Sequence, residues 1–135
     1  MLGTKNIVAF VPTTDFEAAR SFYEGVLGLR FVSVDGFALV LDANGITVRV
    51  SKVPDFKPLP YTILGWEVAD IENDVAALGE RGVQFQHYGF PGQDALGVWT
   101  APSGDKVAWF KDPDGQYAVR VAARIGAHSV RPYRA

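Results

Sequence analysis

Two similar hairpin patterns, far apart in the chain, constrain its fold more than any other feature. Residues 109–121 read WFKDPDGQYAVRV and residues 41–50 read LDANGITVRV, so a β-prone run, a four-residue turn and a second β-prone run occur twice. Proline presets φ for a turn, aspartate and asparagine bond nearby backbone amides, and glycine tolerates positive φ. Two such hairpins indicate that the chain contains a duplicated module.

The first half of the chain predicts the element order βαβββ. Residues 5–11 (KNIVAFV) are apolar and rich in β-branched side chains, which is typical of a strand. Thr14 and Glu17 fit a capping box that begins an amphipathic helix, and Gly28 is a suitable stop for it. Three strands joined by Asp-Gly and Asn-Gly dipeptides follow, at 29–34, 37–42 and 46–52.

The second half repeats this order. A proline-rich linker at 53–61 leads into a strand at 62–68, and Asp70 is placed to cap a helix that ends at Gly82. The remaining strands are predicted at 83–88, 98–101, 106–111 and 116–122. The loop GFPGQDALG at 89–97 is long enough to be mobile, and the sequence leaves open whether it closes over a ligand.

The repeat predicts an α+β fold built from two tandem βαβββ modules, each with its helix on one face of a small curved sheet. We assign module one to 5–52, the linker to 53–61, module two to 62–122 and a tail to 123–135, all within a single domain of residues 1–135. The other face of each sheet must be filled by side chains, by the other module or by a ligand.

Composition and charge exclude several functional classes. The chain has no cysteine, so thiolate metal sites and cysteine nucleophiles are excluded. Its net charge is −2 and no basic stripe is present, which argues against a nucleic-acid partner. No apolar run reaches membrane-spanning length, and no signal-peptide pattern is present, so we expect a cytoplasmic protein without a membrane partner.

Two motifs add a family resemblance. The pattern SFYExxLG at 21–28 on the first helix, together with DPDG at 112–115 before the last strand, resembles the vicinal oxygen chelate superfamily. This group contains glyoxalase I, extradiol dioxygenases and bleomycin-resistance proteins, and the resemblance covers about residues 5–122. It implies a cupped, barrel-like mixed sheet with helices on its outer face, a cavity enclosed by paired modules, and a homodimer.

The metal ligands of the superfamily are not matched in this chain. Metal-dependent members carry histidine, glutamine or carboxylate ligands at positions that correspond to Asn6, Arg49, Ile63 and Val119, with Val48 as a shifted alternative to Arg49. None of these side chains is an imidazole or a carboxylate, the groups that Zn, Ni, Fe or Mn sites require. The resemblance therefore implies a member without the superfamily metal, and we predict no cofactor.

The residues predicted to bind a ligand are mostly aromatic, with two charges among them. They are Phe10, Arg49, Tyr61, Glu67, Trp99, Trp109, Tyr117 and Val119. Trp99 and Trp109 suit stacking on a flat ligand, or alternatively core or dimer packing. Arg49 suits a clamp on an anionic group, or alternatively an ion pair with Glu67.

Glu67 is also a weak candidate for a catalytic base. Among apolar neighbours its pKa would rise and it would act as a base or bind a cation; the alternative is a solvated carboxylate at a strand end. The histidines, His87 and His128, are interpreted as surface or packing residues. Strand alternation places Trp66 on the helix side of its sheet, and a bulge in the last strand would turn Arg120 inward.

Together these patterns predict a metal-independent protein that binds a small, partly aromatic organic molecule in a concave cavity. One alternative is a lyase, isomerase or dioxygenase-like enzyme of the same fold, with a non-standard metal site or with Glu67 as its base. Another is a structural or partner-binding domain with a vestigial cavity. The sequence names neither the ligand nor a reaction, and leaves open whether one chain or two complete the cavity.

Overall fold

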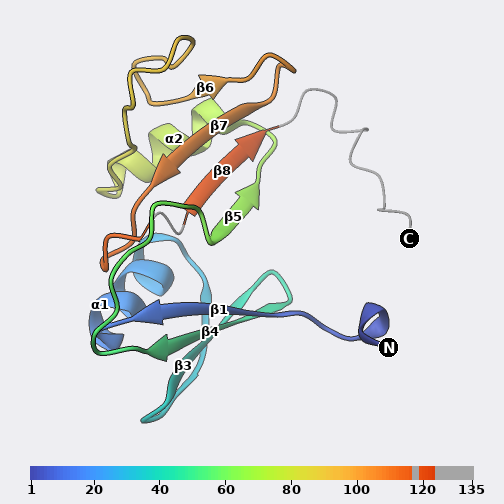
Figure 1. The fold of residues 1–135 in the computed structure, drawn as a ribbon, viewed down its shortest axis with the longest axis vertical. Helices are drawn as coiled ribbons and strands as arrows, with labels where there is room; N and C mark the ends of the chain where they lie inside the picture. The colour runs from blue at the N-terminus through green and yellow to red at the C-terminus, as the bar shows by residue number, and fades with distance from the viewer. Residues whose placement is uncertain (117–118, 124–135) are drawn as a thin grey trace. The chain divides into compact units, whose positions relative to one another are not determined.

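A computed structural model describes residues 1–116 and 119–123, with the side chains of 1–116 (Figure 1). The chain forms two compact units. Unit 1 comprises Met1–Pro60 together with Asp112–Gln116, and unit 2 comprises Tyr61–Lys111 and the last strand. The turn at 112–116, which the sequence places within module two, therefore packs as part of unit 1.

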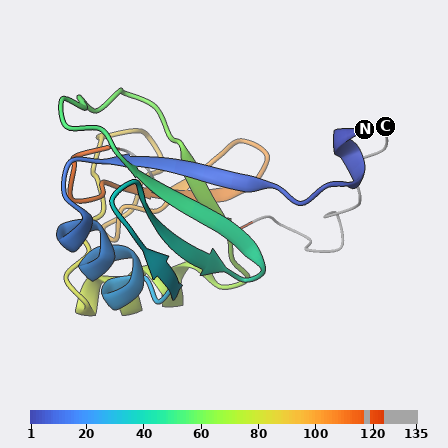
Figure 2. The ribbon, with the colours of Figure 1, turned by 90° about the horizontal axis from the view of Figure 1, so that it is seen from below.

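Unit 1 contains the first βαβββ module. Its elements are η1 (Leu2–Thr4), β1 (Val8–Thr13), α1 (Phe16–Arg20), the π-helical segment η2 (Ser21–Val26), β2 (Arg30–Val34), β3 (Ala38–Ala43) and β4 (Ile46–Lys52). The strand order is β1-β4-β3-β2, in which β1 runs parallel to β4 and the other pairs are antiparallel. The segment before β1 runs away from the sheet (Figure 2).

Unit 2 repeats this topology. Its elements are β5 (Leu64–Glu67), α2 (Ile71–Glu80), β6 (Trp99–Thr100), β7 (Lys106–Phe110) and β8 (Val119–Ala123). The order β5-β8-β7-β6, with β5 parallel to β8, matches β1-β4-β3-β2 strand for strand. The predicted duplication and the α+β class are thereby confirmed.

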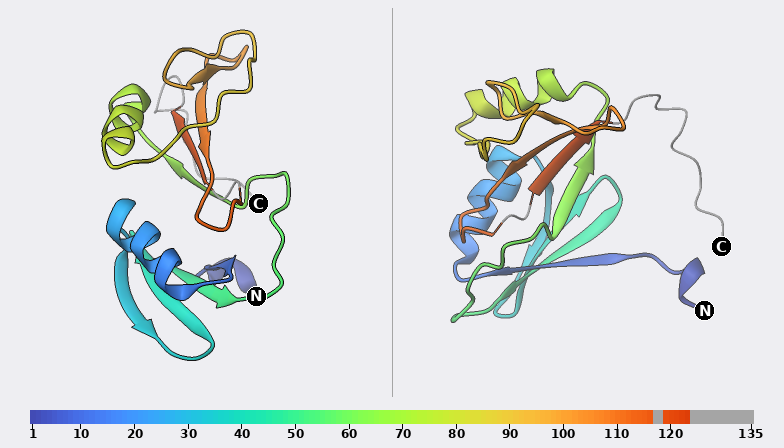
Figure 3. Two further views of the ribbon diagram at one scale, coloured as in Figure 1. Left: turned by 90° about the vertical axis from the view of Figure 1, so that its left-hand side faces the viewer. Right: turned by 45° about the horizontal axis from the view of Figure 1, so that its top comes forward.

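Each helix lies on one face of the sheet of its own unit (Figure 3). In unit 1 the core under the helix is made of alternate strand residues that are at most 1% exposed, namely Val11, Leu39, Leu41, Val48 and Val50. The alternation leaves the intervening residues on the opposite face. One register row of that face runs from Phe10 through Arg49 to Val40, and Phe10 is 64% exposed.

The predicted capping box at Thr14 and Glu17 is wrong. Asp15 caps α1 instead, since its Oδ1 accepts hydrogen bonds from the Glu17 amide at 2.9 Å and the Ala18 amide at 3.4 Å. The Thr14 hydroxyl donates to Oδ1 of Asp114 at 2.6 Å. The predicted helix end is confirmed, because Gly28 has φ 84° and its amide donates to the Glu24 carbonyl at 3.1 Å.

The predicted strand at 83–88 is also wrong. Only Phe85 pairs there, in an isolated antiparallel bridge with Phe110, and the Gln86 amide donates to the Trp109 carbonyl at 2.8 Å. After this contact the chain leaves the sheet and carries its aromatic residues in a loop. Among the described residues no helix is both long enough and apolar enough to cross a membrane.

Candidate functional site

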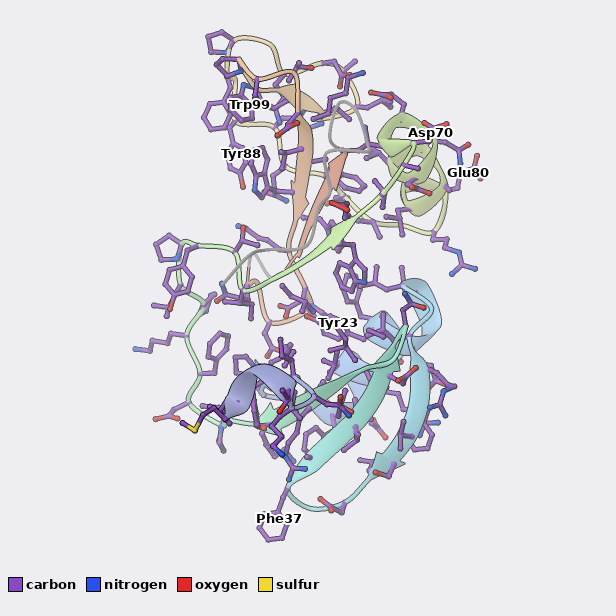
Figure 4. The ribbon with its side chains drawn as sticks, turned by 90° about the vertical axis from the view of Figure 1, so that its right-hand side faces the viewer. Tyr23, Phe37, Asp70, Glu80, Tyr88 and Trp99 are labelled. Atoms are coloured by element: carbon purple, nitrogen blue, oxygen red, sulfur yellow. The ribbon has the colours of Figure 1, made fainter. Side chains whose placement is uncertain are left out.

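Four aromatic rings meet in unit 2, and we call Tyr88, Phe90, Trp99 and Trp109 the aromatic cluster. The rings of Tyr88 and Phe90 stack with centroids 5.2 Å apart, and those of Trp99 and Trp109 lie 6.1 Å apart. Phe90 also contacts both indoles, at 6.1 and 6.3 Å. Tyr88 and Trp99, which Figure 4 labels, lie together in this unit. Such ring pairs stabilise one another beyond the area they bury, so the four rings hold one another in place.

The sheet register explains why the two indoles share a face. Trp99 on β6 pairs with Val107 on β7, and Trp109 is two residues further along β7. Side chains two residues apart point to the same side of a strand, so both indoles project from one face. Ala108 and Phe110 point to the other face, where they are at most 1% exposed.

Gln93 holds the loop that brings the other two rings to this face. Its Oε1 accepts from the Tyr88 amide at 2.8 Å, and its Nε2 donates to the carbonyls of Gln86 at 2.9 Å and Gly97 at 3.0 Å. These bonds use both donors and the acceptor of the amide. Residues 86–97 therefore form a braced segment, and the sequence analysis did not single out Gln93.

A pocket of about 480 Å³ lies beside the cluster, between this loop and the turn that follows β6. Its lining residues are Phe90, Pro91, Trp99, Thr100, Ala101 and Pro102. The Trp99 indole N–H donates to the Pro91 carbonyl at 3.2 Å, which joins the two walls. The volume falls within the range of small-molecule pockets, about 300–1,000 Å³.

Gly97 is a sensitive point of this loop, and Gly97→Ala is expected to lower the free energy of unfolding by about 1–3 kcal/mol. Gly97 has φ 92°, and a Cβ there would lie 3.2 Å from the Cβ of Phe85. Denaturant unfolding would measure the change. Gly79→Ala in α2 is the matched control: its Cβ would meet nothing within 4 Å, and we expect a gain of about 0.5–1 kcal/mol. Equal effects of the two substitutions would contradict the prediction.

The other predicted ligand-binding residues of unit 2 lie outside this pocket. Tyr61 is 55% exposed at the start of the unit. Glu67 is exposed on β5, in the register row that continues through β8 to Val107 and Trp99. Three strand spacings separate Glu67 from Trp99, which is about 14 Å at the usual distance between strands. Glu67 is therefore not placed to act as a base at the pocket.

Phe10 and Arg49 lie in unit 1, where they are neighbours in one register row. Arg49 is half-buried and makes no ion pair with the part of the chain that the structure describes. Asp35 has its pKa held below the ordinary value by hydrogen bonds from the Phe37 and Ala38 amides, with a smaller contribution from the charge of Arg49.

Several of the residues singled out in the sequence fall beyond the side chains that the structure describes, or outside the pocket. Tyr117 and His128 lie outside the described residues, and only the backbone of Val119 and Arg120 is described, in β8. His87 is exposed. Trp66 shares a register row, through β8, with the buried Ala108, so it lies on the helix side of its sheet as predicted.

The sequence analysis missed Tyr88, Phe90 and the two prolines of the pocket. The pattern Tyr-Gly-Phe-Pro at 88–91 carried a usable signal, because two aromatic residues and a proline are unusual in a loop that is only a connector. The sequence analysis assigns Tyr88 to a strand and Phe90 and Pro91 to the loop at 89–97, and it gives Pro102 no role. Tyr88 and Phe90 lie near Trp99 because the Gln93 hydrogen bonds hold their loop, and no local sequence pattern predicts that role of Gln93.

A buried polar network in unit 1 joins the two motifs of the family resemblance. The Tyr23 hydroxyl on η2 donates to Oδ2 of Asp112 at 2.8 Å, and Oδ1 of Asp112 accepts from the amides of Asp114 and Gln116 at 3.0 and 3.1 Å. Tyr23 is 1% exposed and Asp112 is 5% exposed. The arrangement fixes the turn in place and is fully occupied with internal bonds, so we assign it a structural role.

Two further side chains of the same turn anchor it. The Asp114 carboxylate accepts from the hydroxyls of Thr13 and Thr14, each at 2.6 Å. The buried Gln116 amide pairs with the backbone of Leu59, accepting at 2.8 Å and donating at 2.9 Å. The turn is therefore held by residues of β1, the helix and the linker.

Burial raises the pKa of Asp112 above its ordinary value of 3.8, although hydrogen bonds from Tyr23 and Gln116 oppose this shift. Burial, with the nearby Asp112 charge, also raises the pKa of Tyr23. An acid with a raised pKa in the folded state binds more protons than in the unfolded state. Its contribution to stability therefore falls as pH rises from the unfolded pKa through the folded pKa.

We accordingly expect the free energy of unfolding of the wild type, minus that of Asp112→Asn, to decrease as pH rises above about 4. The amide does not titrate, so the difference isolates this carboxyl from the other acidic groups. Urea unfolding of both proteins across the acidic range would measure it. A difference that increases with pH would contradict the assignment.

The residues that the family resemblance assigns to metal positions carry no imidazole or carboxylate. Arg49 carries a positive guanidinium and Ile63 an aliphatic side chain, and Asn6 is exposed before β1. Within residues 1–116, whose side chains are described, no three histidine, aspartate or glutamate side chains come together as a metal site would require.

Comparison with known proteins finds similarity in structure. No protein-family model matches the sequence, and no curated protein is similar enough in sequence to count as a relative. Several solved structures have a similar fold. A glyoxalase/bleomycin resistance protein/dioxygenase from Alicyclobacillus acidocaldarius has a TM-score of 0.72 at 15% identity, covering 95% of this chain and 97% of that one.

Two others are an antibiotic binding protein and a bleomycin-binding protein. TnmS3, an antibiotic binding protein from Streptomyces sp. CB03234, has a TM-score of 0.70 at 22% identity and covers 93% of this chain and 99% of its own. A bleomycin-binding protein complexed with bleomycin has a TM-score of 0.69 at 22% identity, with coverages of 90% and 100%. At these identities the likeness concerns the fold.

Proposed function

We propose that this chain, which has the fold of the vicinal oxygen chelate superfamily, binds a small planar organic molecule against its aromatic cluster and needs no metal to do so. The observation that carries the proposal is the aromatic cluster beside a pocket of about 480 Å³. Partly exposed aromatic rings beside a braced loop can stack on a flat ligand without a large ordering cost.

The structural neighbours support the class of function. Two of them are an antibiotic binding protein and a bleomycin-binding protein, and both align over nine-tenths of this chain or more. The structural likeness shows that the same fold holds small organic molecules in those proteins. For this chain the binding of such a molecule is our inference from the aromatic cluster.

Metal independence is supported by the chemistry of the residues at the superfamily's metal positions. Arg49 would repel a cation, and the side chain of Ile63 has no donor atom.

We also infer a homodimer. Its support is the exposure of apolar side chains at the start of unit 1, where Ile7 is 72% and Phe10 is 64% exposed. Sedimentation equilibrium of the purified protein would test the homodimer.

The binding proposal is tested by titrating ¹⁵N-labelled protein with 2-naphthol, a small planar probe, with and without EDTA. We expect the indole N–H signals of Trp99 and Trp109 to shift in a saturable manner, and the Trp66 signal to shift less. The response should be the same in EDTA. Loss of the response in EDTA would overturn metal independence, and equal shifts of all three indoles would overturn the assigned site.

A further inference from the structure

The pocket beside the aromatic cluster has no ionisable side chain in its lining. It is formed by two aromatic residues, two prolines, an alanine and a threonine. We infer that this pocket selects an uncharged, planar ring system over an anion or a cation of the same shape. This inference rests on the proposed function and adds the charge of the ligand. The sequence instead suggested that a charged ligand is recognised through Arg49 or Glu67.

Two charged groups near the pocket in sequence, Asp94 and Lys106, are already engaged. The Asp94 carboxylate accepts from the amides of Leu96 and Val98, each at 2.9 Å, within the loop. The Lys106 ammonium lies 3.0 Å from the carboxylate of Glu72 on α2. These partners compensate the two charges locally, which leaves them a weak influence on a ligand in the pocket.

The charged candidates from the sequence are not part of the pocket either. Glu67 is separated from Trp99 by three strand spacings, about 14 Å, which exceeds the reach of a glutamate side chain. Arg49 is on β4 of unit 1 and is not among the pocket's lining residues. A charge on the ligand would therefore lose water without gaining a counter-charge in this pocket.

The polar groups of the pocket allow one directed hydrogen bond. The Trp99 indole N–H already donates to the Pro91 carbonyl. Thr100 is among the residues that line the same pocket, and a threonine hydroxyl can donate or accept. A neutral ring with one polar substituent directed at Thr100 thus matches what the lining offers.

The test compares three probes that share the naphthalene ring: 2-naphthol, which is uncharged at neutral pH, 2-naphthoate and 2-naphthylmethylammonium. Affinities are measured by calorimetry, and the indole N–H signals report whether each probe occupies the pocket. Since the pocket offers no counter-charge, we expect 2-naphthol to bind at least about tenfold more tightly than either ion. Thr100→Val should weaken 2-naphthol, whereas the matched control Thr47→Val on β4 should not.

Tighter binding of 2-naphthoate that is lost in Arg49→Met, or of 2-naphthylmethylammonium that is lost in Glu67→Gln, would overturn this inference and leave the proposed function intact. Failure of all three probes to shift the Trp99 signal would overturn both this inference and the proposed function. Retention of full 2-naphthol affinity by Thr100→Val would overturn the assigned hydrogen bond.

Discussion

Asp112→Ala is expected to lower the free energy of unfolding by about 2–4 kcal/mol, one of the largest effects in this chain. The substitution removes the acceptor of the buried Tyr23 hydroxyl and of the amides of Asp114 and Gln116. Each buried donor left without a partner costs about 1–3 kcal/mol, while removal of a carboxyl that burial disfavours returns part of that loss. Equilibrium unfolding in urea would measure the change.

The duplication provides the control for this experiment. Asp42 begins the corresponding turn of the first module, where its Oδ2 accepts from the Gly45 amide at 3.4 Å and lies 3.7 Å from Nε of Arg30. These contacts are long and partly exposed, so Asp42→Ala should cost less than about 1 kcal/mol. If Asp112→Ala and Asp42→Ala lower the free energy of unfolding equally, the hydrogen bond from Tyr23 adds no stability beyond that of an exposed turn.

Tyr23→Phe refines the interpretation, because it removes one bond and keeps the ring. Tyr23 and Asp112 share that bond, so the effects of Tyr23→Phe and Asp112→Ala should sum to more than the effect of the double substitution. Strict additivity in this double-mutant cycle would mean that the two side chains stabilise the fold independently.

Trp99→Ala is expected to weaken the binding of 2-naphthol by about tenfold to a hundredfold, which corresponds to about 1–3 kcal/mol for a lost stacking surface. Trp99 lines the pocket, contacts Phe90 and Trp109, and holds the Pro91 carbonyl. Calorimetric titration of the variant and the wild type would measure the loss.

Phe37→Ala is the matched control for Trp99→Ala. Phe37 is also an aromatic residue, but it is 81% exposed in the turn between β2 and β3 and points away from its sheet (Figure 4). Its removal should leave 2-naphthol affinity unchanged. If both substitutions weaken binding equally, the probe adheres to exposed rings in general and the pocket assignment is wrong.

The candidate site was only half predictable. Trp99 and Trp109 were predicted as ligand-binding residues on strands, and the register of β6 and β7 then places them on a common face. Tyr88 and Phe90 were missed, because the run at 83–88 has the composition of a strand but pairs only at Phe85. Whether a β-prone run enters a sheet depends on which partner strand is available, and that is decided outside the run.

The sequence by itself determined the duplicated topology of this protein. Hairpin dipeptides, glycine stops and the period of apolar residues act within a few positions of the chain, so the same local chemistry written twice produced the same order of strands twice. The family resemblance rested on two such local patterns, at 21–28 and 112–115.

Only the tertiary structure decided which partners the polar side chains took. Thr14 was an equally good helix cap by local rules, yet it bonds Asp114, which lies 100 residues further along the chain, and Asp15 caps the helix instead. Gln93 likewise became the brace of the loop beside the pocket by reaching three backbone groups at once. Hydrogen-bonding side chains have several acceptable partners, and burial selects among them only when distant segments have come together.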